Sequence, residues 1–293
     1  MFIRILIAVS LLFATSMTLP AQTIDLSNVI AGDIIDNTTV IPDGAVINLN
    51  GGTIASGTLF SAAAFPNGVT LNINDGIVGL GVEINNSTIN IAGGQVALGA
   101  TDLSEGVNNI DNDVTVTGGA VGNFFQLRGN STLQLSGGSV EGFGTLLNAS
   151  ANVTGGSFNL VDNNGVLNIS GGDFNTFRVF PTTAVVNLFG TDFAIDGVPI
   201  SGLPLNGVFE ITNRDVTLSG TLSDGSTFSN FLDSTTPIGA LNFDPVFGEV
   251  LPGFATPGST VNVILTPPAV PEPSAIGIIL LSACGLLSRR RRY

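Results

Sequence analysis

The chain repeats one short motif eight times, and this repeat limits the possible folds more than any other feature. Each copy reads apolar, polar, apolar, small or polar, Gly, Gly or a close substitute, any residue, apolar. The copies are residues 47–54, 71–78, 89–96, 114–121, 133–140, 151–158, 167–174 and 186–193. Their second Gly positions are 16 to 25 residues apart, a spacing typical of stacked supersecondary units.

Alternation of apolar and polar residues inside each copy indicates β-strands with one buried face. Helix start signals are missing, and 38 glycines would interrupt helices throughout the chain. We therefore predict an all-β fold, a right-handed parallel β-helix (solenoid) of about eight coils over residues 22–193, with strands stacked about 4.8 Å apart. An antiparallel sandwich is the alternative, and it requires hairpin signals that are few before residue 200.

The repeat also predicts which side chains are buried. Pairs such as Ile47 and Leu49 should form continuous apolar columns inside the fold, and the Gly pair should turn each corner at positive φ. The second residue after the Gly pair should return to the core, and in the last three copies it is Phe158, Phe174 and Phe193.

The polar residue between the two apolar ones forms a column of its own. It is Asn48, Asn72, Asn90, Thr115, Gln134, Asn152, Asn168 and Asn187 in the successive copies. On this register its side chain faces outward, where stacked amides can hydrogen-bond from strand to strand. We favour a structural ladder that fixes the register; the functional alternative is a flat polar strip for sugar hydroxyls.

The pattern changes after Phe193. Asp196-Gly197, Asn206-Gly207 and Asp224-Gly225 are tight-turn dipeptides between alternating segments. We predict that residues 194–265 form an antiparallel β cap, in which residues 216–222 pair with residues 226–228. Such a cap would cover an open sheet edge.

The two ends of the chain carry export signals. Residues 1–21 have a basic Arg4, an apolar stretch and a small Ala21 before the expected cut, as in a secretory signal peptide. A retained anchor is the alternative, but the apolar stretch is too short for a span of about 20 residues.

Residues 266–293 combine a Pro-rich linker, the tripeptide Pro271-Glu272-Pro273, a short apolar run and a basic end. This order resembles the PEP-CTERM sorting signal of exported bacterial proteins. The resemblance implies a short transmembrane helix that holds the chain in the inner membrane until an exosortase-type protease cuts near the tripeptide. A permanent anchor is the alternative. The anchor residues would be Ile276, Ile278, Ile279, Leu280, Leu281, Leu286 and Leu287, and the cytoplasmic stop would be Arg289, Arg290, Arg291 and Arg292.

Composition narrows the chemistry. Between residues 22 and 270, Arg128, Arg178 and Arg214 stand against 21 acidic residues, a formal charge of −18, which disfavours nucleic-acid binding. The chain has no His, so imidazole cannot activate a nucleophile or hold zinc. The single cysteine, Cys284, lies in the apolar run, so the exported body has no disulfide.

Two oxygen-rich places are candidate cation sites. Asp173 and Asp192 follow the turn in successive copies, and stacking would bring their carboxylates about 5 Å apart. Residues 108–113, Asn-Asn-Ile-Asp-Asn-Asp, are the second place. Weak Ca²⁺ binding is the functional hypothesis for both, and solvated turns are the favoured one; otherwise we expect no cofactor.

The sequence thus predicts a non-enzymatic exported protein of the cell surface or extracellular matrix, with a structural or adhesive role. The family resemblance links such proteins to exopolysaccharide and biofilm, so an extracellular polysaccharide is the expected partner. A polysaccharide lyase or hydrolase and a cation-dependent carbohydrate-binding module are the alternatives.

Overall fold

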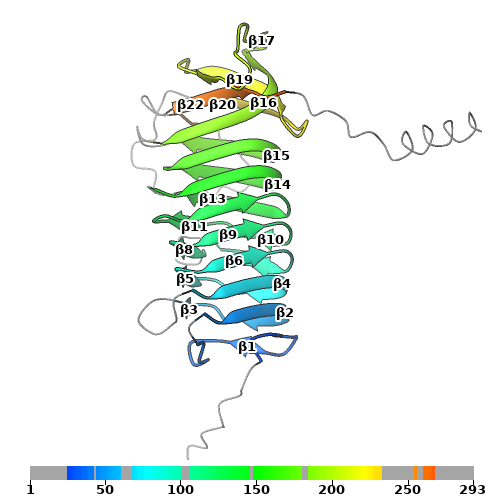
Figure 1. Ribbon diagram of the computed structural model, residues 1–293, viewed down its shortest axis with the longest axis vertical. Coiled ribbons are helices and arrows are strands. Elements are labelled where there is room, and N and C mark those ends of the chain that lie inside the picture. The colour runs from blue at the N-terminus through cyan, green and yellow to red at the C-terminus, as the bar shows by residue number, and fades with distance from the viewer. Residues whose placement is uncertain are drawn as a thin grey trace, which may run out of the picture.

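The protein forms an elongated stack of β-strands (Figure 1). The computed structural model describes residues 25–42, 44–60, 68–100, 106–145, 148–179, 184–232, 254–255 and 260–267, and within them every regular element is a strand. The predicted signal peptide and residues 268–293, with the Pro-Glu-Pro tripeptide, the anchor and the four arginines, lie outside the described residues.

Nine strands stack to form the first wall of the fold. They are β2 (Val46–Ile54), β4 (Thr70–Val78), β6 (Thr88–Ile91), β9 (Asp113–Val116), β12 (Thr132–Leu135), β14 (Ser150–Asn163), β15 (Val166–Val179), β16 (Val185–Ile195) and β22 (Thr260–Leu265). Each is parallel to the next, and equivalent repeat positions are direct partners, such as Asn48 with Asn72 and Asn72 with Asn90.

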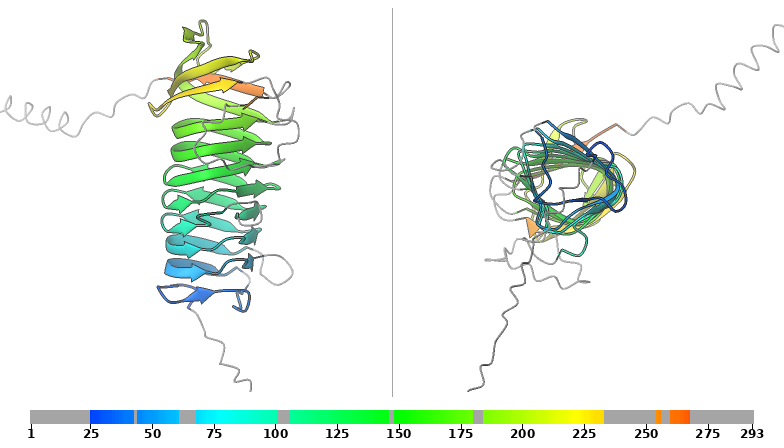
Figure 2. Two further views of the ribbon diagram at one scale, coloured as in Figure 1. Left: turned by 180° about the vertical axis from the view of Figure 1, so that it is seen from behind. Right: turned by 90° about the horizontal axis from the view of Figure 1, so that it is seen from below.

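The shorter strands outside the first wall complete the ring of each repeat. They are β1 (Ile34–Ile35), β3 (Leu59–Phe60), β5 (Glu83–Asn85), β7 (Gln95–Val96), β8 (Asn108–Ile110), β10 (Ala120–Val121), β11 (Phe125–Arg128) and β13 (Ser139–Thr145). They also pair in parallel with equivalent segments of the neighbouring repeat, for example β7 with β10 and β8 with β11. Seen from below, the stacked strands enclose a ring (Figure 2).

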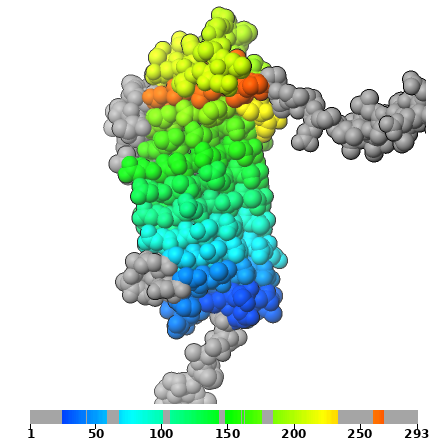
Figure 3. All heavy atoms as spheres, in the orientation of Figure 1, coloured from blue at the N-terminus to red at the C-terminus, as the bar shows by residue number. Residues whose placement is uncertain are grey.

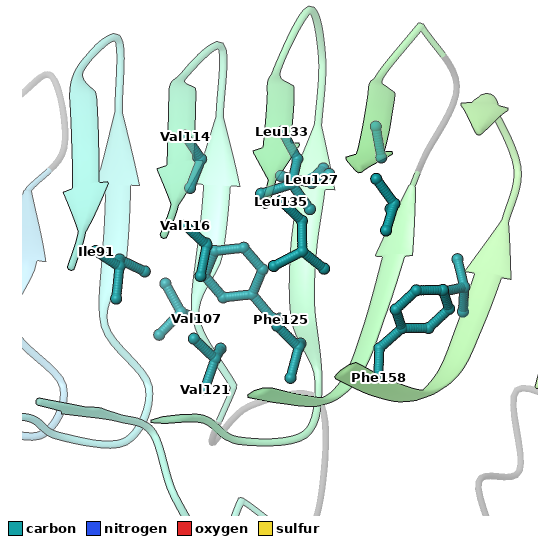
Figure 4. Packing of buried hydrophobic residues seen from close by; sticks show 14 of the residues in the cluster. Ile91, Val107, Val114, Val116, Val121, Phe125, Leu127, Leu133, Leu135 and Phe158 are labelled. Atoms are coloured by element: carbon teal, nitrogen blue, oxygen red, sulfur yellow. The ribbon is translucent and has the colours of Figure 1, made fainter. Parts of the chain in front are cut away.

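The interior of this ring is apolar, as the alternation predicts. Ile47, Leu49 and their counterparts are buried, as are the residues that follow the Gly pair, from Ile54 to Phe193. Figure 4 shows Phe125, Leu133 and Leu135 pointing into this interior between the strands. The buried residues form one cluster that continues from Val29 into Leu222 and Leu232, so the two ends of the molecule share a core.

We call the part built from β1 to β15 the body, and residues 190–265 the cap. In the cap, β19 (Val216–Leu222) and β20 (Thr227–Leu232) form the predicted antiparallel hairpin, with Thr221 opposite Thr227. The remaining strands are β17 (Val198–Pro199), β18 (Val208–Glu210) and β21 (Phe254–Ala255). β22, the orange band above the green repeats in Figure 3, pairs with β16 and β18, although it follows the hairpin in the chain.

The predicted fold class, a right-handed β-helix, is corrected by these findings. The predicted C-terminal transmembrane helix falls on residues outside the described ranges. The 22 strands of the described residues belong to one sheet, which closes as a parallel barrel around the core and contains the eight repeat strands as parallel neighbours. The eighth copy does not complete a coil, because β16 leaves the parallel pairing with β15 after Leu188 and pairs antiparallel with β19. No helix occurs in the described ranges, and none there is long and apolar enough to cross a membrane. Alternation and glycine corners specify a closed sheet with an apolar interior, but they do not fix the path by which it closes.

Candidate functional site

The most regular chemical feature of the surface is the column of amides on the first wall. Its side chains face outward because the residues on either side, such as Leu71 and Ile73 around Asn72, are buried. The Asn72 Nδ2 atom donates to Asn48 Oδ1 at 2.7 Å, and Asn90 Nδ2 donates to Asn72 Oδ1 at 2.8 Å. The predicted amide ladder is therefore present in the first repeats.

The ladder resumes towards the cap. Asn168 donates to Asn152 at 2.7 Å, Asn187 donates to Asn168 at 2.8 Å, and Asn262 on β22 donates to Asn187 at 2.8 Å. Asn262 lies 75 residues from Asn187 in sequence, outside the eight repeats. The segment Val261-Asn262-Val263 has the same apolar–Asn–apolar pattern, which was the available signal.

Thr115 and Gln134 occupy the two middle positions of the ladder, on β9 and β12. A shorter second ladder runs beside its first half, where Asn50 donates to Asn28 at 2.8 Å and Asn74 donates to Asn50 at 2.9 Å. All these amides donate from the later strand to the earlier one, so their dipoles are aligned along the stack.

We define the ladder face as the ladder together with the column of outward residues on each side of it, before the glycine corner of each strand of the first wall. Besides the ladder it contains hydroxyl side chains, namely Thr70, Thr88, Thr132, Ser150 and Thr260 on one side and Thr117, Ser136, Thr154 and Ser170 on the other. Val46 and Val166 are exposed apolar members of the same face. Asp113 is the one charged residue among these positions, and it accepts a 2.8 Å hydrogen bond from the Thr132 hydroxyl. The face is thus mostly polar and almost uncharged on a strongly acidic protein.

The candidate acidic pair has different strand partners. Asp173 lies opposite Ser157 on β14, whereas Asp192 lies opposite Thr221 on β19. The parallel ladder between β15 and β16 ends at Ile169 and Leu188, before either aspartate is reached. Both aspartates are exposed. The strand pairing therefore does not stack Asp173 on Asp192, because the hairpin takes the place that a further repeat would have occupied.

Asp224 is the acidic residue that the structure places at that corner. Its Oδ2 atom accepts a 2.8 Å hydrogen bond from the Gly172 amide, and its own amide donates to the Ser170 carbonyl. Partial burial opposes ionisation of this carboxyl, but hydrogen bonds from the Ser226 hydroxyl and amide and from Gly172 outweigh it and lower the pKa of Asp224. The sequence marked Asp224 only as a turn residue.

Most polar groups of residues 108–113 form hydrogen bonds within the protein. Asn109 and Asn112 are buried, and the Asn112 Nδ2 atom donates to the Ile84 carbonyl at 2.7 Å. The Ser87 amide donates to Asn112 Oδ1 at 2.8 Å, and the Asn130 amide donates to Asp111 Oδ1 at 2.8 Å. These contacts connect neighbouring repeats at the corner before the first wall. Across the ranges that the structure covers, no three acidic, His or Cys residues gather in a group that could hold a metal ion.

Comparison with known proteins gives no assignment. No protein-family model, no curated protein and no solved structure matches this chain. The ladder face, the corner networks and the terminal motifs are therefore the evidence from which a function can be argued.

Proposed function

We propose that the chain is an exported structural and adhesive protein of the cell surface or extracellular matrix, and that it acts without catalysis. The observation that carries this proposal is the in-register stacking of the first wall, in which equivalent positions pair directly from β2 to β22. A parallel stack with one continuous core is stiff and elongated, as a scaffold or spacer must be.

The adhesive surface in this proposal is the ladder face, and its partner is a neutral, hydroxyl-rich extracellular polysaccharide. Asn72, Asn90, Asn168 and Asn187 each use one N–H on the neighbouring amide, which leaves a second N–H for a ligand. Because the side chains are already held in place by bonds of 2.7 to 2.8 Å, binding would cost little side-chain entropy. An anionic polymer would be repelled by the chain, whose residues 22–270 carry a formal charge of −18.

The route to the surface in this proposal uses the terminal motifs. The N-terminal segment directs export, the C-terminal segment holds an inner-membrane intermediate, and an exosortase-type protease releases the body near Pro271-Glu272-Pro273. Fractionation of cells and the intact mass of the mature protein test this route. We expect a surface or extracellular product without the arginine cluster, and an uncut membrane form when Pro271 and Pro273 are both changed to Ala.

Pro268→Ala is the matched control, since it changes a proline of the same linker outside the tripeptide. A wild-type product that stays inside the cell, or one that keeps its full C-terminal mass at the surface, would contradict the proposed route.

Adhesion is tested separately by co-sedimentation of the purified chain with insoluble neutral polysaccharides. Gln134→Arg places a long charged side chain in the middle of the ladder face, and we expect at least a tenfold loss of binding to the polymer that the wild type binds. The control is Asn175→Arg, because Asn175 is exposed on β15 outside the ladder face, where its amide donates to Asn159. Equal loss in both variants would contradict a role for this face.

A further inference from the structure

The ladder face is much longer than it is wide. The ladder runs from Asn48 on β2 to Asn262 on β22, and the strand spacings between them, each about 4.8 Å, make it about 38 Å long. Along one strand the face has only the outward positions before the glycine corner, such as Thr70, Asn72 and Asn74, a width of about 13 Å. A long and narrow surface of this kind can accommodate one linear polymer chain that lies along the stack.

The same chemical group recurs on this face only along the stack. Two runs of hydrogen-bonded amides lie in the ladder, namely Asn48, Asn72 and Asn90, and then Asn152, Asn168, Asn187 and Asn262. Within each run every amide donates to the one before it, so the spare N–H groups recur once per strand spacing. The neighbouring column is less regular, because Val46, Asp113 and Val166 interrupt its hydroxyl groups. A ligand that matches the ladder must therefore repeat along the stack.

We propose that this ligand is a neutral β-1,4-linked glycan of the cellulose type, which lies along the ladder with one sugar residue opposite each strand. The inference rests on the proposed adhesion to a polysaccharide and specifies the linkage of that polymer. A β-1,4-linked glucose chain is extended, because both of its linkage bonds are equatorial, and each residue is about as long as one strand spacing of about 4.8 Å. Hydroxyl oxygens lie along both edges of such a chain, so each amide can donate its spare N–H to one of them.

Other extracellular polymers match the ladder less well. An α-1,4-linked glucose chain coils, so its hydroxyl groups turn away from a straight row of amides after a few residues. A uronate polymer adds a carboxylate to each residue, which Asp113 on the face and the formal charge of −18 over residues 22–270 would repel. Extension and neutrality together select the β-1,4-linked glycan.

The interruption of the ladder sets the length of glycan that binds best. Thr115 has no amide, and Gln134 carries its amide one methylene farther from the backbone, so these two residues separate the runs. The longer run has four asparagines, Asn152, Asn168, Asn187 and Asn262. Each sugar residue up to the fourth should therefore tighten binding about threefold, the net contribution of one hydrogen bond. Further residues should add less.

Isothermal titration calorimetry of the purified chain with cello-oligosaccharides, from the dimer to the hexamer, tests the inference. The affinity should rise about threefold per residue up to the tetramer and then level off. Maltotetraose, which is α-1,4-linked, should bind at least tenfold more weakly than cellotetraose. Thr115→Asn combined with Gln134→Asn joins the two runs, so this variant should bind the hexamer about ninefold more tightly than the tetramer. A purely structural ladder would leave the length dependence unchanged.

Ser139→Asn combined with Ser157→Asn is the matched control. It adds two amides at directly paired positions that follow the glycine corner and lie outside the ladder face. Its length dependence should equal that of the wild type.

Three results would overturn the inference. They are equal affinity for the two linkages, affinity that does not rise with length, and no gain for the hexamer in the variant with joined runs. The proposed adhesion would still stand if an insoluble neutral polysaccharide sediments with the wild type and less with Gln134→Arg. If no neutral polysaccharide binds in either experiment, the adhesion proposal fails together with this inference.

Discussion

The body and the cap join their strands in different ways. In the body, each strand pairs in parallel with the equivalent strand of the next repeat, about 16 to 25 residues away. In the cap, β16 pairs with β19 in the antiparallel direction and with β22 in the parallel one. The stack thus ends with β19 and β22, two strands that do not belong to the repeats.

The corner of the last body repeat shows how this ending works. Where another Gly-Gly pair would lie over Gly171 and Gly172, the turn of the hairpin supplies Asp224. The ring of Phe228 likewise continues the aromatic column, with its centroid 5.7 Å from that of Phe174, which stacks on Phe158 at 5.2 Å. Phe193, the expected next member, lies 6.3 Å from Phe228. The hairpin therefore imitates a repeat in its contacts without having the sequence of one.

The largest expected effect tests whether the cap shares the core of the body. Phe228→Ala should lower the free energy of unfolding by about 3–5 kcal/mol, because it empties a buried site between Phe174 and Phe193. Denaturant unfolding should still show one transition, since the buried cluster is continuous. Phe209→Ala, at an exposed position of β18, should change stability far less. Two separate transitions would mean that the cap folds independently.

A pair of glycine variants compares corners of the two regions. Gly119 and Gly225 both have positive φ, 78° and 93°, so alanine costs about 1–2 kcal/mol in strain at either site. At Gly119 a new Cβ would also lie 2.6 Å from the Gly93 carbonyl oxygen, whereas nothing lies within 4 Å at Gly225. We expect a loss of about 3 kcal/mol or more for Gly119→Ala, and about 1–2 kcal/mol for Gly225→Ala. Equal losses in denaturant unfolding would show that the repeats are not packed this closely.

The ladder should make a smaller contribution. Asn72→Ala removes two amide bonds and leaves Asn48 and Asn90 without a partner in the column, at an expected cost of about 1–2 kcal/mol. Thermal unfolding of this variant can be compared with that of Asn130→Ala, an exposed Asn outside the ladder. If the two changes in Tm are the same, the ladder does not stabilise the stack.

The smallest expected effect concerns pH and the cap. The pKa of Asp224 is lowered by folding, so its contribution to stability is full above the unfolded-state value of about 3.9 and is lost as pH falls through the folded-state value. The wild type should be slightly more stable than Asp224→Asn at pH 7, and this difference should shrink as the pH falls below about 3.9. If the difference stays constant with pH, the contribution of Asp224 to stability does not depend on its charge.

Much of the body could be predicted from the sequence because each repeat has its own apolar–polar alternation and its own glycine corner. The alternation identified the buried columns, and the glycine pairs identified the corners, where Gly94, Gly119 and Gly138 have positive φ as expected. The register followed from the same repeat, so the amide ladder could be predicted before any contact was known. These features depend on residues close together in the chain.

The path of closure, the ninth strand of the wall and the place of Asp224 could not be predicted in this way. β22 is 75 residues from its partner β16, and its pairing depends on an edge that exists only after the body has folded. The buried contacts of Asn112 likewise join residues 25 and 28 positions apart, which local composition presented as an exposed turn. Each of these features depends on contacts between residues that are far apart in the chain.

The position of β22 has a mechanical consequence. The described chain ends at Pro267, two residues after β22, and β22 lies across the end of the stack farthest from Asp25. Tension applied to the chain beyond Pro267 would load this strand first and open its hydrogen bonds to β16 one after another, starting at the Thr266 amide, which donates to the Gly190 carbonyl. The earlier repeats would bear load only after that strand had peeled away, so β22 would act as a sacrificial link that protects the rest of the stack.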